Sequence, residues 1–258
     1  MLGAIAGDII GSVYEATPIK RTDFPLFQTA STFTDDTVLT IAVADSLLND
    51  KGYIQSLQDW GRKYPNAGYG GNFINWIFDH NPQPYHSWGN GSAMRVSPVG
   101  WAFDKLERVQ QEASKSAEVT HNHPEGIRGA EATATAIFLA RQGSGKPAIK
   151  AHIEKHYAYD LSRRLEEIRP HYRFDVSCQG SVPEAIIAFL ESEDFEDSIR
   201  LAVSLGGDSD TQACIAGSIA EAYYGSVPPK IADEVRHRLP EDLHSIVAMF
   251  RQAYSITP

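Results

Sequence analysis

Residues 34–48 read TDDTVLTIAVADSLL, in which two adjacent carboxylates precede an almost uninterrupted apolar segment. Apolar residues would occur nearly all round a helix of this sequence, which predicts that the helix is buried. Thr34 is a good N-cap, and Asp35 and Asp36 would then occupy the first turn, where the helix dipole favours negative charge. The stretch therefore predicts a buried helix that begins at residue 35.

The periodicity of the remaining chain is also mostly helical. In residues 2–16, apolar residues recur at three- and four-residue steps, and glycines at every fourth position would let another helix approach closely. The apolar positions are Leu2, Ile5, Ile9 and Val13, and the glycines are Gly3, Gly7 and Gly11. Further helices are predicted near 52–63, 71–80, 92–103, 105–120, 124–142, 182–192, 195–205, 210–225, 230–238 and 242–255.

Strand signals are rare, and the best candidate is HYRFDVS at residues 171–177, where Tyr172, Phe174 and Val176 alternate with polar residues. About a dozen helices with almost no strand predict an all-α fold, an orthogonal bundle. The loop at 143–147, GSGKP, is predicted to be a surface turn, and no loop has the composition of an interdomain linker. We therefore expect one domain over residues 1–258.

Composition limits the classes of function. The 258 residues carry a formal net charge of −10, which argues against binding to nucleic acid or to an acidic membrane surface. Asp8 interrupts the apolar N-terminus, which has no basic region, so neither a signal peptide nor a membrane-spanning helix is expected. Cys178 and Cys214 are the only cysteines and form no CxxC pair, which favours a reducing, cytoplasmic location.

A second acidic helix start lies at residues 204–225, SLGGDSDTQACIAGSIAEAYYG. Asp208, Asp210 and Thr211 could simply cap this equally apolar helix. However, two buried helices must pack together, so that their acidic ends can share one pocket. Carboxylates in one pocket raise each other's pKa unless cations neutralise them, and Mg²⁺ prefers such oxygen ligands. Four or five carboxylates exceed the usual need of one Mg²⁺ ion, which makes two ions plausible.

Asp8, Ser12 and Glu15 would share one face of the N-terminal helix. This face could be solvated, or it could look into the acidic pocket with Glu15 near the rim.

Two glycine-rich loops, YGGNF at 69–73 and SWGNGSAMR at 87–95, could bring backbone N–H groups to a phosphate, or could be ordinary connections. Arg95 could add a cation and Trp88 a stacking face. His121 and His123 lie just before a predicted helix, where histidines are usually surface or capping residues.

Six motifs, in order, resemble the ADP-ribosylglycohydrolase family: GAIAGDIIGSVYE, FTDDT, YGGN, GNGSAMR, THNHPEG and GGDSDT. The resemblance covers nearly the whole chain and is weakest between about 143 and 181. It implies an all-α fold with a binuclear Mg²⁺ or Mn²⁺ centre at the base of an ADP-ribose cleft. The implied metal-binding residues are Thr34, Asp35, Asp36, Asp208, Asp210 and Thr211. The implied substrate-binding residues are Tyr69, Gly70, Gly71, Asn72, Ser87, Trp88, Gly89, Asn90, Gly91 and His121.

The expected activity is metal-dependent hydrolysis of the glycosidic bond between ADP-ribose and an acceptor, by a monomer, with Glu15, Asp36 or Asp208 assisting proton transfer. Arginine-linked members are expected to carry an extra catalytic Asp before GNGSAMR, where this chain has only Asp79. Alternatives are a metal-dependent nucleotide phosphohydrolase and a non-catalytic ADP-ribose-binding or structural member of the family.

Overall fold

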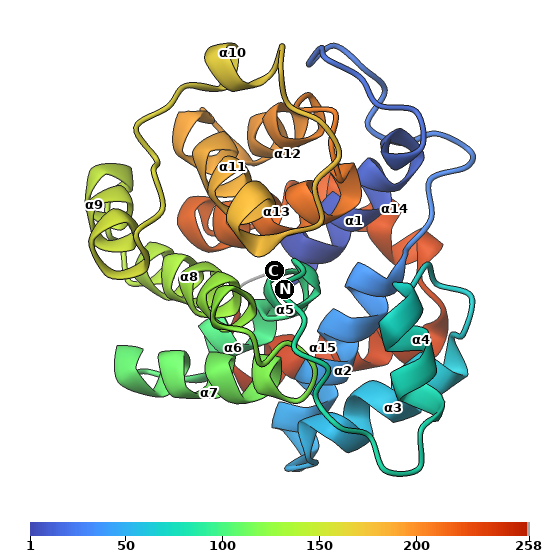
Figure 1. The fold of residues 1–258 in the computed structure, drawn as a ribbon. Helices are drawn as coiled ribbons and strands as arrows, with labels where there is room; N and C mark the ends of the chain where they lie inside the picture. The colour runs from blue at the N-terminus through green and yellow to red at the C-terminus, as the bar shows by residue number, and fades with distance from the viewer. Residues whose placement is uncertain (257–258) are drawn as a thin grey trace.

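The computed structural model describes residues 1–256, which form fifteen helices and no β-strand (Figure 1). The all-α prediction is therefore confirmed, while the expected domain of residues 1–258 extends two residues beyond the described part. The helices are α1 (Leu2–Glu15), α2 (Asp35–Asn49), α3 (Tyr53–Lys63), α4 (Gly71–Phe78), α5 (Gly91–Met94), α6 (Ser97–Ala102), α7 (Leu106–Glu118), α8 (Pro124–Arg141), α9 (Lys146–Tyr157), α10 (Leu165–Ile168), α11 (Cys178–Glu191), α12 (Phe195–Val203), α13 (Ser209–Tyr224), α14 (Pro229–Arg238) and α15 (Glu241–Ala253).

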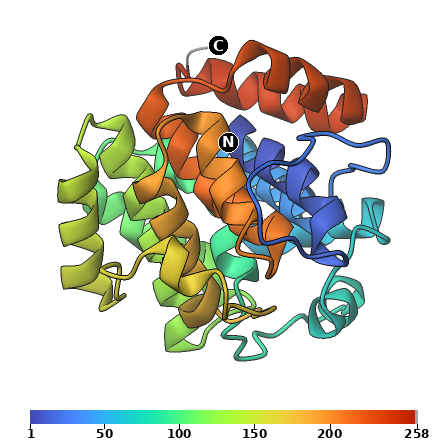
Figure 2. The same ribbon diagram turned by 90° about the horizontal axis from the view of Figure 1, so that it is seen from above.

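Helices α1 and α13 pack side by side at the centre of the molecule. All residues of α13 from Ser209 to Ala222 are buried, and α2 is buried from Asp36 to Ser46. Figure 2 shows α14 and α15, in red, laid across one side of this centre. The two most apolar predicted helices are therefore interior helices, and their acidic N-termini begin inside the protein.

The glycines of α1 allow the close approach of α13. A Cβ atom added at Gly7 would lie 2.0 Å from the carbonyl oxygen of Ala213, and one at Gly3 would lie 2.3 Å from the carbonyl oxygen of Gly217. Both obstacles are backbone atoms, which cannot rotate away. The prediction that another helix approaches the glycine face is confirmed.

Gly7→Ala is expected to lower the free energy of unfolding by about 3 kcal/mol, because α1 and α13 must move apart to admit the methyl group. Alanine's better helix propensity, about 1 kcal/mol, is too small to offset this clash. Chemical denaturation would measure the change. The control is Gly52→Ala, where an added Cβ meets nothing within 4 Å and a change of about 1 kcal/mol or less is expected. Equal stability of the two variants would contradict the proposed packing constraint.

Several helix boundaries differ from the predictions. Residues 92–103 form two helices rather than one, because Pro98 in the first turn of α6 starts a new helix. Helix α11 begins at Cys178 rather than near 182, since Ser177 caps it and Pro183 lies inside the helix. Helices α9 and α10 were not predicted. The turn at Gly143 exists, with φ +80°, but α9 begins within the predicted loop, with Pro147 in its first turn.

The strand predicted at residues 171–177 is wrong. Its only ladder contact is an isolated bridge between Gly89 and Ser177, closed by hydrogen bonds from Asn90 N to Val176 O (2.7 Å) and from Cys178 N to Trp88 O (2.9 Å). Ser177 then caps α11, so the chain turns into a helix before a strand can extend.

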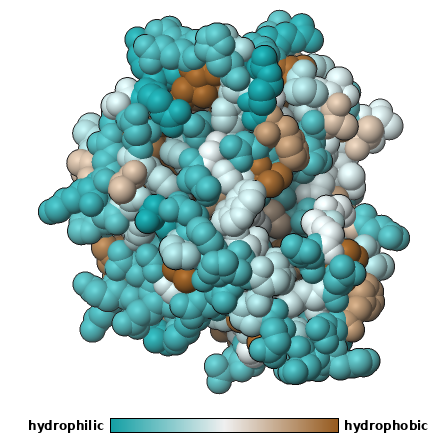
Figure 3. Space-filling model, viewed as in Figure 1, coloured by the Kyte–Doolittle hydropathy of each residue, from teal (hydrophilic) through white to brown (hydrophobic). Residues whose placement is uncertain are grey.

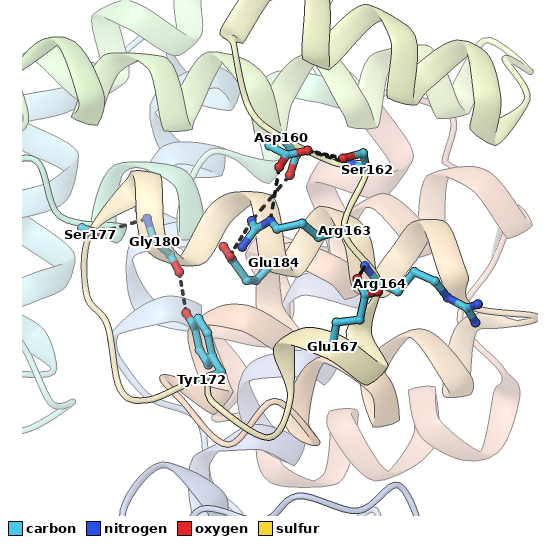
Figure 4. Close-up of polar contacts among 9 residues, drawn as sticks. All are labelled: Asp160, Ser162, Arg163, Arg164, Glu167, Tyr172, Ser177, Gly180 and Glu184. Carbon is cyan, nitrogen blue, oxygen red and sulfur yellow. Dashed lines mark hydrogen bonds and ion pairs between the residues drawn. The ribbon is translucent and has the colours of Figure 1, made fainter.

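The segment before α11 is held against that helix by polar contacts (Figure 4). Arg163 Nη2 donates to Glu184 Oε1 at 2.7 Å, and the Tyr172 hydroxyl donates to the carbonyl oxygen of Gly180 at 2.6 Å. This attachment fixes the course of residues 172–177 and brings Phe174 and Val176 to the cleft described below.

The face seen in Figure 3 is predominantly hydrophilic, with apolar residues scattered over it. Within residues 1–256, every helix is too short or too polar to cross a membrane. Both cysteines are free and buried.

Candidate active site

A cleft of about 440 Å³ lies where the N-termini of α2, α4 and α13 and the C-terminus of α1 meet. Its lining includes all six residues predicted to bind metal and Glu15. It also includes eight of the ten residues predicted to bind substrate: Gly70, Gly71, Asn72, Ser87, Gly89, Asn90, Gly91 and His121. Segments more than 100 residues apart in sequence therefore contribute to one cleft.

The start of α2 is held by Asp8 of α1. The Thr34 and Thr37 N–H groups both donate to Asp8 Oδ2 at 3.0 Å, and the Thr34 hydroxyl donates to Asp8 Oδ1 at 2.7 Å. The Thr37 hydroxyl donates to Asp8 as well. Thr34 Oγ1 also accepts from Asp36 N at 3.3 Å, so the predicted N-cap is confirmed. Asp8 acts as a further cap supplied by a neighbouring helix, which directs Asp35 and Asp36 toward the cleft.

The start of α13 meets that of α2 across the cleft floor. Gly206, at φ +61°, turns the chain just before Asp208, whose Oδ2 accepts from Asn90 Nδ2 at 2.8 Å. The Thr211 hydroxyl donates to Asp36 Oδ2 at 3.3 Å and links the two helix starts. The other carboxylate oxygen, Asp36 Oδ1, is buried and has no hydrogen-bond partner among residues 1–256.

Two groups of carboxylates have oxygen atoms close enough to share a metal ion. Oxygens of Asp8, Asp36 and Asp210 lie within 4.8 Å of one another, as do oxygens of Glu15, Asp208 and Asp210. Asp210 belongs to both groups. Carboxylate oxygens at this spacing suit a hard divalent cation.

Burial and mutual repulsion raise the pKa of the carboxylates in this cluster. Burial, followed by the charges of Asp8 and Asp208, raises the pKa of Asp35 to about 8. Burial likewise raises the pKa of Asp36 and Asp210 well above the ordinary value, and neighbouring carboxylates add to the effect. The pKa of the more exposed Glu15 is raised by burial and by Asp208 and Asp8. Bound cations would offset this repulsion and favour the charged form of the carboxylates.

A second part of the cleft lining is made of backbone and small residues. Helix α4 begins at Gly71, and a Cβ added at Gly70 or Gly71 would meet nothing within 4 Å, so this helix start is open to the cleft. A helix N-terminus with free N–H groups attracts anions. The Gly89–Gly91 turn, which also lines the cleft, packs against His121, whose Nε2 lies 3.2 Å from the position of a Cβ on Gly91.

Two predicted substrate-binding residues, Tyr69 and Trp88, do not line the cleft. The Tyr69 side chain packs on Phe73, with ring centroids 5.4 Å apart, and the Trp88 ring is 47% exposed. The alternation that suggested a strand at 171–177 marks instead two side chains that do line the cleft, Phe174 and Val176. Tyr85 also lines the cleft. It was not predicted to do so, because nothing in its local sequence distinguishes it from an ordinary aromatic residue in a loop.

Together, the fold and the cleft define a class of all-helical proteins in which the acidic N-termini of two buried helices and two glycine-rich segments line one cleft. A model of the ADP-ribosylglycohydrolase family matches residues 1–256. The chain belongs to this family and is a hydrolase of glycosyl bonds.

The relatives agree with this assignment. "ADP-ribosylhydrolase ARH3" of Gallus gallus is 27% identical, over 89% of this chain and 86% of that protein, and the Homo sapiens protein of the same name is 27% identical over 87% and 84%. "ADP-ribosylarginine hydrolase Tri1" of Pseudomonas putida is 25% identical over 91% and 72%. A solved structure described as "ADP-ribosylglycohydrolase-related protein complex" superposes with a TM-score of 0.75 at 26% identity, covering 100% of this chain and 97% of that one.

Proposed function

We propose that this cleft binds ADP-ribose conjugates and hydrolyses the N- or O-glycosidic bond to the acceptor with the help of two divalent cations, Mg²⁺ or Mn²⁺. The observation that carries the proposal is the buried Asp36 Oδ1, which has no hydrogen-bond partner within residues 1–256 while other carboxylates crowd around it. A buried carboxylate oxygen without a donor is costly unless a cation or a proton satisfies it.

The donor set fits hard cations. Asp36, Asp208 and Asp210 would hold the ions, with Asp35, Thr34 and Thr211 completing the oxygen shell. The sharing of Asp210 between the two carboxylate groups supports a two-ion centre. Asp8 already accepts hydrogen bonds from Thr34 and Thr37 through both of its oxygens, which favours a supporting role. The bound cations would supply positive charge that binds ribose hydroxyls and acidifies water.

We assign proton transfer during hydrolysis to Glu15. It lies at the C-terminus of α1, is exposed on the cleft, and has an oxygen within 4.8 Å of oxygens of Asp208 and Asp210. Burial, followed by the charges of Asp208 and Asp8, raises the pKa of Glu15 above its ordinary value, which favours a role as a proton donor or acceptor. The surrounding carboxylates, among them Asp36 and Asp208, would stabilise the oxocarbenium-like charge that develops at the anomeric carbon.

We assign ligand binding to the two glycine-rich segments that line the cleft. The open start of α4 at Gly70, Gly71 and Asn72 and the 87–91 turn would hold the diphosphate and ribose through backbone N–H groups. Phe174, which is 55% exposed and lines the cleft, offers an apolar face for the ligand.

We also propose that the protein is a monomer and that it acts in the cytoplasm.

The type of acceptor depends in part on whether the cleft contains the extra catalytic Asp expected of arginine-linked members. Asp79, the only Asp between Asp59 and Asp104, is exposed and does not line the cleft. We therefore do not propose Asp79 as the extra catalytic carboxylate of arginine-linked members, and both N- and O-linked acceptors belong in the substrate panel.

A substrate panel tests the proposal. We expect free ADP-ribose to be released from serine-linked, arginine-linked, polymeric or O-acetyl conjugates, and release to fall at least about 100-fold in chelator and return with Mg²⁺ or Mn²⁺. Chromatography separates ADP-ribose from AMP and inorganic phosphate. Release of AMP or phosphate would identify a phosphohydrolase instead, and binding of ADP-ribose without turnover of any conjugate would identify a non-catalytic member.

A further inference from the structure

Arg95 is the largest fully buried side chain of the protein, and it borders the cleft. Its Nη2 donates to the carbonyl oxygen of Ser116 at 2.7 Å and to Thr120 Oγ1 at 2.8 Å. Its Nε and Nη1 are buried without a hydrogen-bond partner in residues 1–256, and both acceptors of Nη2 are neutral oxygens. A buried guanidinium held only by neutral acceptors needs a reason beyond packing.

Thr120 connects this guanidinium to His121. Thr120 Oγ1 lies 2.7 Å from His121 Nδ1, and the Thr120 side chain is fully buried. A guanidinium can only donate, so one lone pair of the hydroxyl oxygen accepts from Arg95. The hydroxyl proton remains, and among residues 1–256 its only acceptor within hydrogen-bond distance is Nδ1 of His121.

These hydrogen bonds favour one tautomer of His121. If Nδ1 carried the proton, it would donate to Oγ1, and the buried Thr120 hydroxyl proton would have no acceptor. With Nδ1 unprotonated, the Thr120 hydroxyl accepts from Arg95 Nη2 and donates to Nδ1, so that both the hydroxyl and Nδ1 are satisfied and the ring proton resides on Nε2. The doubly protonated ring is also disfavoured, because burial and the charge of Arg95 lower the pKa of His121 well below its ordinary value.

The protonated nitrogen faces the ligand wall. Nε2 lies 3.2 Å from the position of a Cβ on Gly91 and 3.6 Å from one on Gly89, and His121 lines the cleft. Tyr85, whose ring centroid lies 6.0 Å from that of His121, is the other titratable group beside the ring. Within the described residues, Nε2 makes no hydrogen bond, so it is free to donate to a ligand.

We propose that Arg95 and Thr120 are positioning residues that hold His121 as the neutral Nε2–H tautomer, so that the cleft presents a fixed hydrogen-bond donor to an acceptor oxygen of the ligand. The identity of that oxygen, on a phosphate or a ribose of ADP-ribose, rests on the proposed function. The tautomer itself does not.

The direct test is ¹⁵N–¹H long-range NMR of the full-length protein with labelled histidine, with the His121 signals assigned by loss in His121→Gln. We expect a protonated Nε2, an unprotonated Nδ1, and no titration of this ring between about pH 5 and about pH 8. A protonated Nδ1 would overturn the inference. This readout requires neither ADP-ribose nor turnover, so it stands even if the proposed substrate is wrong.

A matched pair of variants tests the positioning role. Thr120→Val keeps the shape but removes the hydroxyl, whereas Thr120→Ser keeps the hydroxyl. We expect Thr120→Val to raise the Kd for ADP-ribose, and KM more than kcat, by about tenfold, and Thr120→Ser to stay within about twofold of the wild type. Unchanged affinity in folded Thr120→Val would refute the role. If Thr120→Val does not fold, the wild-type tautomer and its retention in Thr120→Ser decide the question.

Discussion

Asp36→Asn is expected to lower the rate of ADP-ribose release about 10³-fold while leaving the protein folded. Asparagine preserves the shape of the side chain but replaces a charged oxygen ligand by a neutral amide, so the cluster loses one of the charges that hold a cation against the reacting sugar. The link from the Thr211 hydroxyl to this side chain can be kept, because the amide oxygen still accepts. Release of ADP-ribose measures activity, and calorimetric titration with Mn²⁺ measures the accompanying loss of metal affinity.

Asp59→Asn is the control for this prediction. Asp59 is an exposed carboxylate on α3, outside the cleft, and the same chemical change there should leave activity within about twofold. If Asp36→Asn and Asp59→Asn released ADP-ribose at the same rate, the acidic cluster would have no part in the reaction.

The metal-free protein is expected to lose stability as pH rises, opposite to the usual effect of titrating paired carboxylates. Asp35, Asp36 and Asp210 have a higher pKa in the folded protein than in the unfolded chain, so the folded state binds their protons more tightly. The stability from this difference is complete below the unfolded pKa, near 4, and is lost as pH rises through the folded pKa, about 8 for Asp35.

The expected loss between about pH 5 and about pH 8 is on the order of 3 kcal/mol, after allowance for the partial exposure of Asp35, or a fall in Tm of about 10 °C. Calorimetry in the presence of a chelator measures it, and added Mg²⁺ should restore the Tm at the upper pH because cations replace the protons. Metal-free Asp36→Asn should show a smaller fall, and Asp59→Asn the wild-type fall. A metal-free Tm that rises steadily over this pH range would contradict the charged-cluster argument.

Features that depend on neighbours along the chain could be predicted from sequence. Thr34 caps α2 as expected, and the glycines of α1 permit the contact with α13, because capping and helical periodicity are set within a few residues. The errors have local causes too. Pro98, Pro147 and Pro183 each lie within a helix, two of them in a first turn, and the prediction misjudged where α6 and α11 begin and missed α9.

The sequence by itself therefore determined the helical class, the two buried helices with acidic starts, and the residue types that line the cleft. Only the tertiary structure decided that Asp8 caps a neighbouring helix, that Phe174 and Val176 complete the cleft wall, and that the Arg95–Thr120 contact selects one tautomer of His121. These features depend on hydrogen bonds and packing between residues far apart in the chain, and spacing along the sequence carries no information about which distant groups meet.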